Sequence, residues 1–235
     1  MSQIDPTATL ASLVAEQPGR APLFERPRLD YCCGGSTTLS DACAAAGFDV
    51  GTVLAALDAI DAAGGGGERL EGVDWHRASV EDLCAHIVAE HHAYLNRTLP
   101  RIQEQLVTVI AAHGPAHPEL AELVAIFTRI RHELEPHLAT EEHRLFPVCI
   151  AVERGGPSVD EELLREHERE HASVGAELAR LRAQANDYEP GRALCATHRS
   201  LLTALADLER DLHQHIHEEN NILFAHVREL GRTVG

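Results

Sequence analysis

The chain has 235 residues, of which 37 are acidic and 20 basic, so its formal net charge is −17. A surface this acidic repels phosphate backbones and anionic lipids, and we therefore expect no nucleic acid and no membrane among its partners. All of the basic residues are arginines, which excludes mechanisms that require a lysine, such as Schiff-base catalysis. The sequence has no apolar run long enough to span a bilayer, and its first residues lack the basic start and apolar stretch of a secretory signal, so we expect a cytoplasmic protein.

The segment 1–63 is predicted to form a small helical domain. Helices are expected over residues 9–17, 38–46 and 50–62, because a Thr or Asp that can cap a helix stands at the start of each stretch. A turn-rich loop, Asp30-Tyr31-Cys32-Cys33-Gly34-Gly35, connects the first two helices. Four consecutive glycines then begin a segment, 64–75, which we expect to be a linker that lets the small domain swing relative to the rest.

The remaining segment, 76–231, contains four stretches in which apolar residues recur at alternating steps of three and four. This spacing is typical of helices that pack along a common axis. The first of the four apolar seams begins at Val88, and turn signals containing Gly and Pro separate the stretches. We therefore predict an all-α fold, in which four helices of about 20 to 27 residues form an antiparallel four-helix bundle after the small helical domain.

Polar residues interrupt the apolar seams in a pattern that repeats. A histidine and a glutamate four residues apart occur in the second helix of each predicted hairpin, and the two pairs are 78 residues apart. A single histidine occurs in the first helix of each hairpin, and these two are 79 residues apart. Since residues i and i+4 share a helix face, all six side chains should converge on the bundle axis. The candidate metal ligands are His92, His137, Glu141, His171, His215 and Glu219.

Four imidazoles and two carboxylates favour a dinuclear metal site. This donor set contains no thiolate and suits iron, manganese or zinc, and two bridging carboxylates favour iron or manganese. Carboxylates without a counter-charge on an apolar seam would cost several kcal/mol each. Hydrogen-bonded packing would explain one such histidine, but it does not explain six polar residues that repeat with a nearly constant offset.

The other histidines are expected outside the ligand set. His167 lies on a seam one turn before His171, but its counterpart in the first hairpin is Val88, so we place it beside the metals. The motif His167-Glu168-x-x-His171 matches a zinc-protease pattern, but that function would leave the remaining polar seam residues unexplained. Five more histidines lie off the seams and are expected at the surface or beside the ligands: His91, His132, His143, His213 and His217.

The adjacent pair Cys32 and Cys33 is the second candidate for chemistry. Neighbouring cysteines rarely form a disulfide with each other, and a loop before a helix can stabilise thiolates. Iron transfer, nitrosylation and thiol exchange remain open as roles, and so does a purely structural turn. The other four cysteines are expected to be packing residues: Cys43, Cys84, Cys149 and Cys195.

These motifs resemble a known family. The six seam residues, with the run Glu141-Glu142-His143-Arg144-Leu145-Phe146-Pro147, resemble a hemerythrin-like domain. The run from Asp30 to Gly35 resembles the cysteine-pair signature of the small domain that precedes it in iron–sulfur cluster repair di-iron proteins. Together the two motifs cover nearly the whole chain in the expected order.

The resemblance implies a non-haem di-iron centre, bridged by oxo or hydroxo, in a cytoplasmic bacterial protein. It implies repair of iron–sulfur clusters after nitrosative or oxidative stress, by binding or reducing nitric oxide or by supplying iron. Glu141 and Glu219 would bridge the irons and the four histidines would be terminal ligands, with their pairing left open.

Nitric oxide or O2 and iron–sulfur client proteins would be the partners, and a homodimer is an open alternative. If the protein is an enzyme, it would be a di-iron oxidoreductase acting on nitric oxide. A hemerythrin-like O2 or redox sensor or carrier without repair activity is the alternative function.

Overall fold

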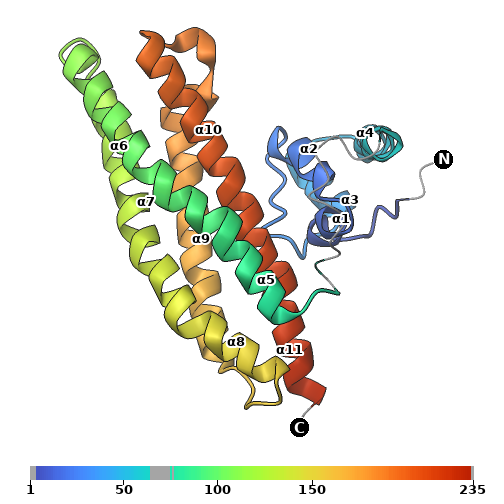
Figure 1. Cartoon of the computed structure of the whole chain (residues 1–235). Helices are drawn as coiled ribbons and strands as arrows, with labels where there is room; N and C mark the ends of the chain where they lie inside the picture. The colour runs from blue at the N-terminus through green and yellow to red at the C-terminus, as the bar shows by residue number, and fades with distance from the viewer. Residues whose placement is uncertain (1–3, 64–74, 76, 234–235) are drawn as a thin grey trace.

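The computed structural model describes residues 4–63, 75 and 77–233. Within these ranges the protein consists of helices and one isolated bridge between Thr9 and Thr38, with no strand, so the predicted all-α class is confirmed. Figure 1 shows long helical rods side by side, with a group of short helices against one face of α10. The predicted linker, 64–75, lies outside the described residues except for Trp75, and so does His76.

Four rods form the bundle, and three of them contain a π-helical turn. The rods of the first hairpin consist of α5 (Val80–Ile87), η2 (Val88–His92) and α6 (Ala93–His113), and of α7 (Leu120–Thr140), η3 (Glu141–Leu145) and α8 (Phe146–Glu153). Those of the second hairpin are α9 (Glu161–Gln184), and α10 (Ala196–His217) with η6 (Glu218–Leu223) and α11 (Phe224–Thr233). The turns η2, η3 and η6 are π-helical, and short 3-10 turns at Asn186–Tyr188 and Pro190–Arg192 connect α9 to α10.

The expected helix lengths hold for α9, which has 24 residues, and are too short for the other three rods. In each of these rods the helix continues through a π turn at the polar positions into a further helical segment, α5, α8 or α11. The added residue of a π turn also shifts the apolar seam. Val88 was expected to face the core, but Ile87 is the fully buried residue and Val88 is only partly buried.

A polar layer divides the apolar interior of the bundle in two. One cluster lies between α6, α7, α9 and α10, where α6 packs mainly on α10 and α7 on α9. The other lies between α5, α8, the start of α9 and α11. The candidate ligands fall between these clusters along each rod, so the metal site is held by apolar packing on both sides.

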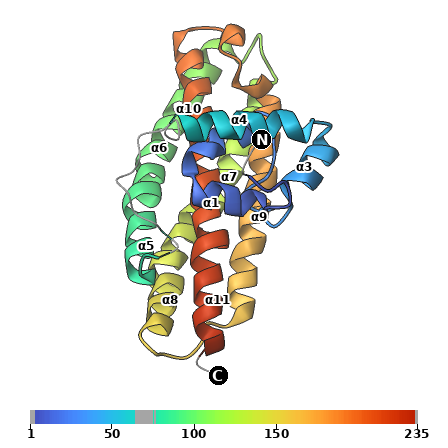
Figure 2. The same cartoon turned by 90° about the vertical axis from the view of Figure 1, so that its right-hand side faces the viewer.

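The N-terminal helices form their own core and pack on the bundle. They are α1 (Leu10–Glu16), η1 (Pro18–Arg20), α2 (Ala21–Glu25), α3 (Leu39–Ala46) and α4 (Val50–Ala62). Thr9, Thr38 and Asp49 cap α1, α3 and α4 as expected, whereas α2 was not predicted. Their apolar core includes Ile216 of α10, and Figure 2 shows α1 and α4 lying across the bundle.

Gly35 lies where the small domain contacts Asn221 of the bundle, and we predict that Gly35→Ala destabilises the protein. A Cβ here would lie 2.6 Å from the Tyr31 carbonyl oxygen, 2.7 Å from the Ala11 Cβ and 2.9 Å from the Asn221 Oδ1. Overpacking of this kind lowers the free energy of unfolding by about 1–3 kcal/mol. Chemical denaturation measures the effect. The control is Gly51→Ala on α4, where the one neighbouring atom is an Asp49 carboxylate oxygen at 3.3 Å. Equal stability of the two variants would contradict this close contact.

Candidate metal centre

The structure brings all six predicted residues together at one level of the bundle. Each of them is at most 8 % exposed, and both glutamates are fully buried. One histidine or one histidine–glutamate pair comes from each rod, as the repeat in the sequence predicted. The residues are His92 of η2, His137 of α7, Glu141 of η3, His171 of α9, His215 of α10 and Glu219 of η6.

The histidines form two pairs. The Nε2 atoms of His92 and His215 are 3.2 Å apart, and those of His137 and His171 are 3.0 Å apart. Each pair forms a potential ligand group with both Glu141 and Glu219, so the two groups share their carboxylates. The pairing that the sequence left open therefore joins the first rod to the last and the second to the third.

Both carboxylates lie between the two histidine pairs. Glu141 places Oε1 2.9 Å from the Nε2 of His137 and Oε2 3.4 Å from that of His92. Glu219 places Oε1 3.1 Å from the Nε2 of His215 and Oε2 3.1 Å from that of His171. Each carboxylate thus turns one oxygen toward each pair, which is the arrangement of a carboxylate that bridges two cations.

The unsatisfied polar atoms of the centre fit metal ions. Both oxygens of Glu141 and one oxygen of Glu219 are buried without a hydrogen-bond partner, although imidazole nitrogens lie close to them. Buried polar atoms are otherwise almost always hydrogen-bonded. Metal–ligand bonds of about 2.0–2.2 Å would place neighbouring octahedral ligands about 3 Å apart. The observed spacings of 2.9–3.4 Å between the ligand atoms agree with that geometry.

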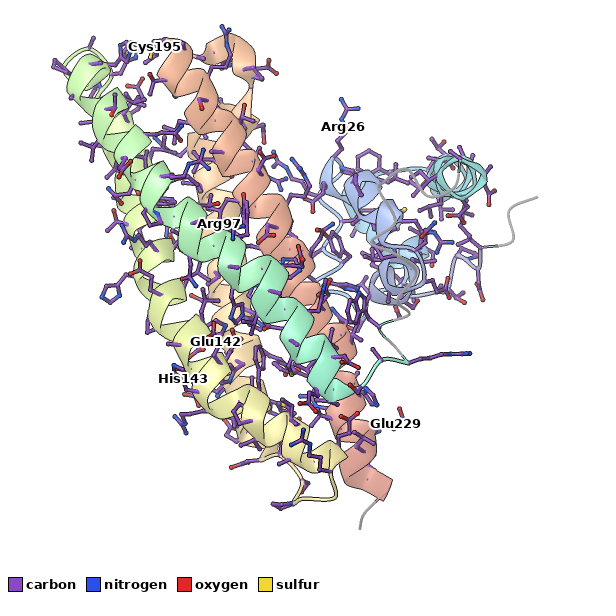
Figure 3. All side chains as sticks on the ribbon, in the orientation of Figure 1. Arg26, Arg97, Glu142, His143, Cys195 and Glu229 are labelled. Carbon is purple, nitrogen blue, oxygen red and sulfur yellow. The ribbon has the colours of Figure 1, made fainter. Side chains whose placement is uncertain are left out.

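Outer hydrogen bonds orient three of the four imidazoles. Each Nδ1 faces a side-chain oxygen, so that each Nε2 is directed at the centre. The contacts are His92 to Glu142 at 2.8 Å, His137 to Glu170 at 2.7 Å and His171 to Asn220 at 2.8 Å. Glu142 is labelled beside His143 on the rod of α7 and α8 in Figure 3. The fourth ring, His215, stacks on His91 with centroids 5.3 Å apart.

Both glutamates are held in the ionised form. Burial alone would raise their pKa values, but the imidazoles around them act more strongly in the opposite direction. The pKa of Glu141 is well below its usual value because of His137, His171 and His92. The pKa of Glu219 is lowered to about 2, although the charge of Glu141 opposes this, because of His215 and His171. The carboxylates are therefore available as anionic ligands at neutral pH.

The cysteine loop contacts the rods that carry His171 and Glu219. Asn221, two residues after Glu219, donates from Nδ2 to the carbonyl of Cys32 at 2.9 Å. His217 donates from Nδ1 to the carbonyl of Tyr31 at 3.2 Å. A Cβ on Gly175, one turn after His171, would lie 3.7 Å from the sulfur of Cys33. The loop is therefore docked beside the metal centre.

The two cysteines are chemically different. Asp30 accepts hydrogen bonds from the backbone N–H groups of both, at 3.1 and 2.9 Å, which fixes the turn. The Cys32 thiol lies 3.3 Å from the Asp30 Oδ1 and 4.0 Å from the sulfur of Cys33, and its hydrogen bond to that sulfur lowers the pKa of Cys33. The same hydrogen bond and burial raise the pKa of Cys32 well above its usual value. Cys33, which is exposed, is therefore the more reactive thiol.

Two pockets lie along helix α9, on different faces of it. One, of about 370 Å³, lies between the cysteine loop and the bundle and is lined by Cys33, Gly175 and His213 among others. The second, of about 500 Å³, opens between α7 and α9 and is lined by His137, His167 and Glu170 among others. The second pocket thus reaches one of the six candidate ligands, His137.

Comparison with known proteins gives the same assignment for both parts of the chain. Residues 84–227 match the hemerythrin HHE cation-binding domain family, and residues 6–61 match a domain of unknown function, DUF542. The iron–sulfur cluster repair protein YtfE of Yersinia pseudotuberculosis is 30 % identical over 216 residues, which cover 92 % of this chain and 94 % of the relative. The iron–sulfur cluster repair protein ScdA of Staphylococcus haemolyticus is 26 % identical over 217 residues, covering 92 % and 95 %. This chain belongs to the hemerythrin-like iron–sulfur cluster repair family.

The five histidines expected at the surface or beside the ligands differ in burial. His132 and His143 are exposed, and His91 is buried beside the candidate ligand His215. His217 is buried and His213 is half-buried, and both rings lie against Tyr31 of the small domain. His167 is also buried, and its Nδ1 faces the Leu163 carbonyl oxygen at 2.9 Å while its Nε2 has no hydrogen-bond partner. Of the remaining cysteines, Cys195 is half-buried and the other three are buried. No helix in the described part of the chain is long and apolar enough to cross a membrane.

We predict that Cys33 is alkylated faster than Cys32 at neutral pH, by at least about tenfold. The lowered pKa of Cys33 gives it the larger thiolate fraction, and its exposure admits the reagent. Limited iodoacetamide treatment followed by fragment mass spectrometry locates the label. Cys195, which lies at the start of α10 in Figure 3, is the internal reference. Preferential labelling of Cys32 would show that the hydrogen bond between the thiols has the opposite direction.

Proposed function

We propose that this protein holds two iron ions between the two histidine pairs, and that it uses them in the repair of iron–sulfur clusters damaged by nitrosative or oxidative stress. The observation that supports the proposal most strongly is the pair of fully buried carboxylates, each with one oxygen toward each histidine pair. In this proposal Glu141 and Glu219 bridge the metals. His92 and His215 are terminal ligands of one iron, and His137 and His171 are terminal ligands of the other.

The chemistry of the donors favours iron over zinc at this centre. All eight candidate donor atoms are imidazole nitrogens or carboxylate oxygens, and structural zinc sites more often use thiolates in a four-coordinate shell. Two histidines and two carboxylate oxygens leave an octahedral ion with positions for an oxo or hydroxo bridge and for one small ligand. When bound, the iron pair would supply redox chemistry and a site for a diatomic molecule such as nitric oxide.

The protein's own residues supply access to this site. The pocket between α7 and α9 includes His137, which is the most exposed of the six candidate ligands at 8 %. A diatomic molecule is small enough to pass from there to the polar layer. Glu142, Glu170 and Asn220 hold the imidazoles in place, so that ligand exchange does not require the helices to rearrange.

The cysteine loop would connect the iron pair with a client protein. Cys33 lines the pocket on the bundle surface and has the lowered pKa expected of a thiolate that binds iron or reacts with nitrogen oxides. It lies beside Gly175, one turn from His171. Relatives of the chain carry the name of iron–sulfur cluster repair proteins over nearly their whole length, so we propose damaged iron–sulfur proteins as the clients.

We predict that Glu219→Ala, or Glu141→Ala, reduces the iron content from two per chain to one or none. A bridging carboxylate contacts both ions, whereas each histidine contacts one, so the loss should be larger than that from a histidine substitution. Elemental analysis and the near-ultraviolet absorption of the oxidised protein measure the result. Glu229→Ala on the same terminal rod is the matched control, because Glu229 is exposed.

Substitution of His167 tests whether this histidine also binds iron. His167→Ala should keep both irons, since its counterpart in the first hairpin is Val88. Two irons with an unchanged spectrum in Glu219→Ala would contradict the bridging role. Loss of one iron in His167→Ala would instead add His167 to the ligands.

The cysteines are predicted to act in repair but not in iron binding. The double substitution Cys32→Ser with Cys33→Ser should keep two irons and the reaction with nitric oxide, because no proposed ligand comes from the small domain. Recovery of a nitric-oxide-damaged iron–sulfur enzyme should fall by about tenfold or more, because the proposed transfer thiol is lost. Iron content, nitric oxide binding and enzyme recovery are measured beside the parent.

The control is Cys43→Ser, which changes a buried thiol of the same domain. Unchanged enzyme recovery in the double variant would reduce the cysteine pair to a structural turn. Loss of iron would show that the small domain completes the metal centre.

A further inference from the structure

A second group of metal-ligand side chains lies outside the six residues of the iron centre. It consists of His86 on α5, His91 on η2 and Glu218 on η6. The Nε2 of His86 is 3.3 Å from the Oε2 of Glu218, and the Nε2 of His91 is 3.5 Å from the same oxygen. All three side chains are at most 15 % exposed.

These spacings suit one tetrahedral ion. Metal–ligand bonds of about 2.0–2.1 Å place the donor atoms of a tetrahedral zinc site about 3.3 Å from one another. Hydrogen bonding does not account for the group, because the Nε2 of His86 and the Oε2 of Glu218 are buried without a partner of suitable geometry. Two histidines and one glutamate are a recurrent zinc ligand set that leaves the fourth position for water.

Asp211 supplies the outer support that such a site requires. Its Oδ1 lies 2.9 Å from the Nδ1 of His91, so a proton on Nδ1 fixes the ring with its Nε2 lone pair toward Glu218. Carboxylates occupy this position behind many zinc-bound histidines. Trp75 stacks on the ring of His86 with centroids 4.1 Å apart and limits its rotation. Two of the three candidate ligands are therefore held in a ligating orientation.

We propose that His86, His91 and Glu218 bind one Zn²⁺ ion at the side of the bundle. The site is separate from the iron centre but next to it, since His91 and Glu218 precede His92 and Glu219 in the chain and His91 stacks on His215. Zinc here would join the first rod to the last at the two π turns that carry His92 and Glu219. It would therefore hold those turns in place while leaving the iron ligands free to bind iron.

The site has a built-in reporter, because Trp75 is the single tryptophan of the chain and lies on His86. Zn²⁺ is titrated into the full-length protein that already contains its iron, and Trp75 fluorescence is followed. Zinc and iron are then counted after dialysis against a weak chelator. We expect one zinc per chain, a saturable fluorescence change and no loss of iron.

Three variants assign the zinc to this site. His86→Phe keeps a ring against Trp75 but removes a ligand, and zinc affinity should fall by at least about 100-fold with iron retained. His132→Phe, at an exposed position of α7, should bind zinc as the parent does. Cys32→Ser with Cys33→Ser should also bind as the parent does, which excludes the cysteine loop as the zinc site.

Failure to retain zinc in the parent, or unchanged affinity in His86→Phe, would overturn the proposal. Retention that depends on Cys32 and Cys33 would overturn it as well. If His86→Phe does not fold, as judged by circular dichroism and iron content, Co²⁺ replaces Zn²⁺ in the parent. The comparatively intense visible d–d bands of tetrahedral Co²⁺, without a thiolate charge-transfer band, would then support the site. Weak bands typical of six-coordinate Co²⁺, or a thiolate band, would contradict it.

Discussion

The structure depends on two carboxylates buried on the axis of a bundle whose interior is mainly apolar. Glu141 and Glu219 are fully buried, and their mutual repulsion adds to the cost of removing each from water. Four imidazoles surround them and keep them ionised. Two cations between the histidine pairs would satisfy the oxygens that have no hydrogen-bond partner, and apolar layers above and below would keep water away from the resulting centre.

The π turns allow the helices to place polar ligands on the axis between two apolar layers. An α-helix repeats a face every three or four residues, and a single added residue rotates the rest of the helix by about 100°. The turns occur at His92, Glu141 and Glu219, on three of the four rods. The rods can therefore direct polar ligands at the axis for one turn and then return apolar residues such as Leu145 and Leu223 to the core. Half-buried residues of these turns, Glu142 and Asn221, make the outer contacts with His92 and Cys32.

The sequence was sufficient to predict the bundle and the six converging residues, because the repeat of His-x-x-x-Glu at 78 residues has no simple packing explanation. It was not sufficient to predict which face of each helix turns toward the core after a π turn, or how the small domain packs against the bundle. Val88 was assigned to the apolar seam because a regular α-helix would place it on the core-facing side. The π turn shifts the register by one residue, so Ile87 is buried instead. The group of His86, His91 and Glu218 was missed, since its residues come from two rods that are far apart in the sequence and do not follow the repeat of the six ligands. The contact of Asn221 with Cys32 likewise has no local signal.

Mössbauer and electron paramagnetic resonance spectra of the oxidised, iron-loaded full-length protein, recorded with total iron, test most directly whether Glu141 and Glu219 bridge two irons. A bridged ferric pair is expected to give two irons per chain, quadrupole doublets without magnetic splitting, and no resonance signal from the ground state. A strong signal from isolated ferric ions, or a single iron per chain after loading with excess iron, would contradict the account.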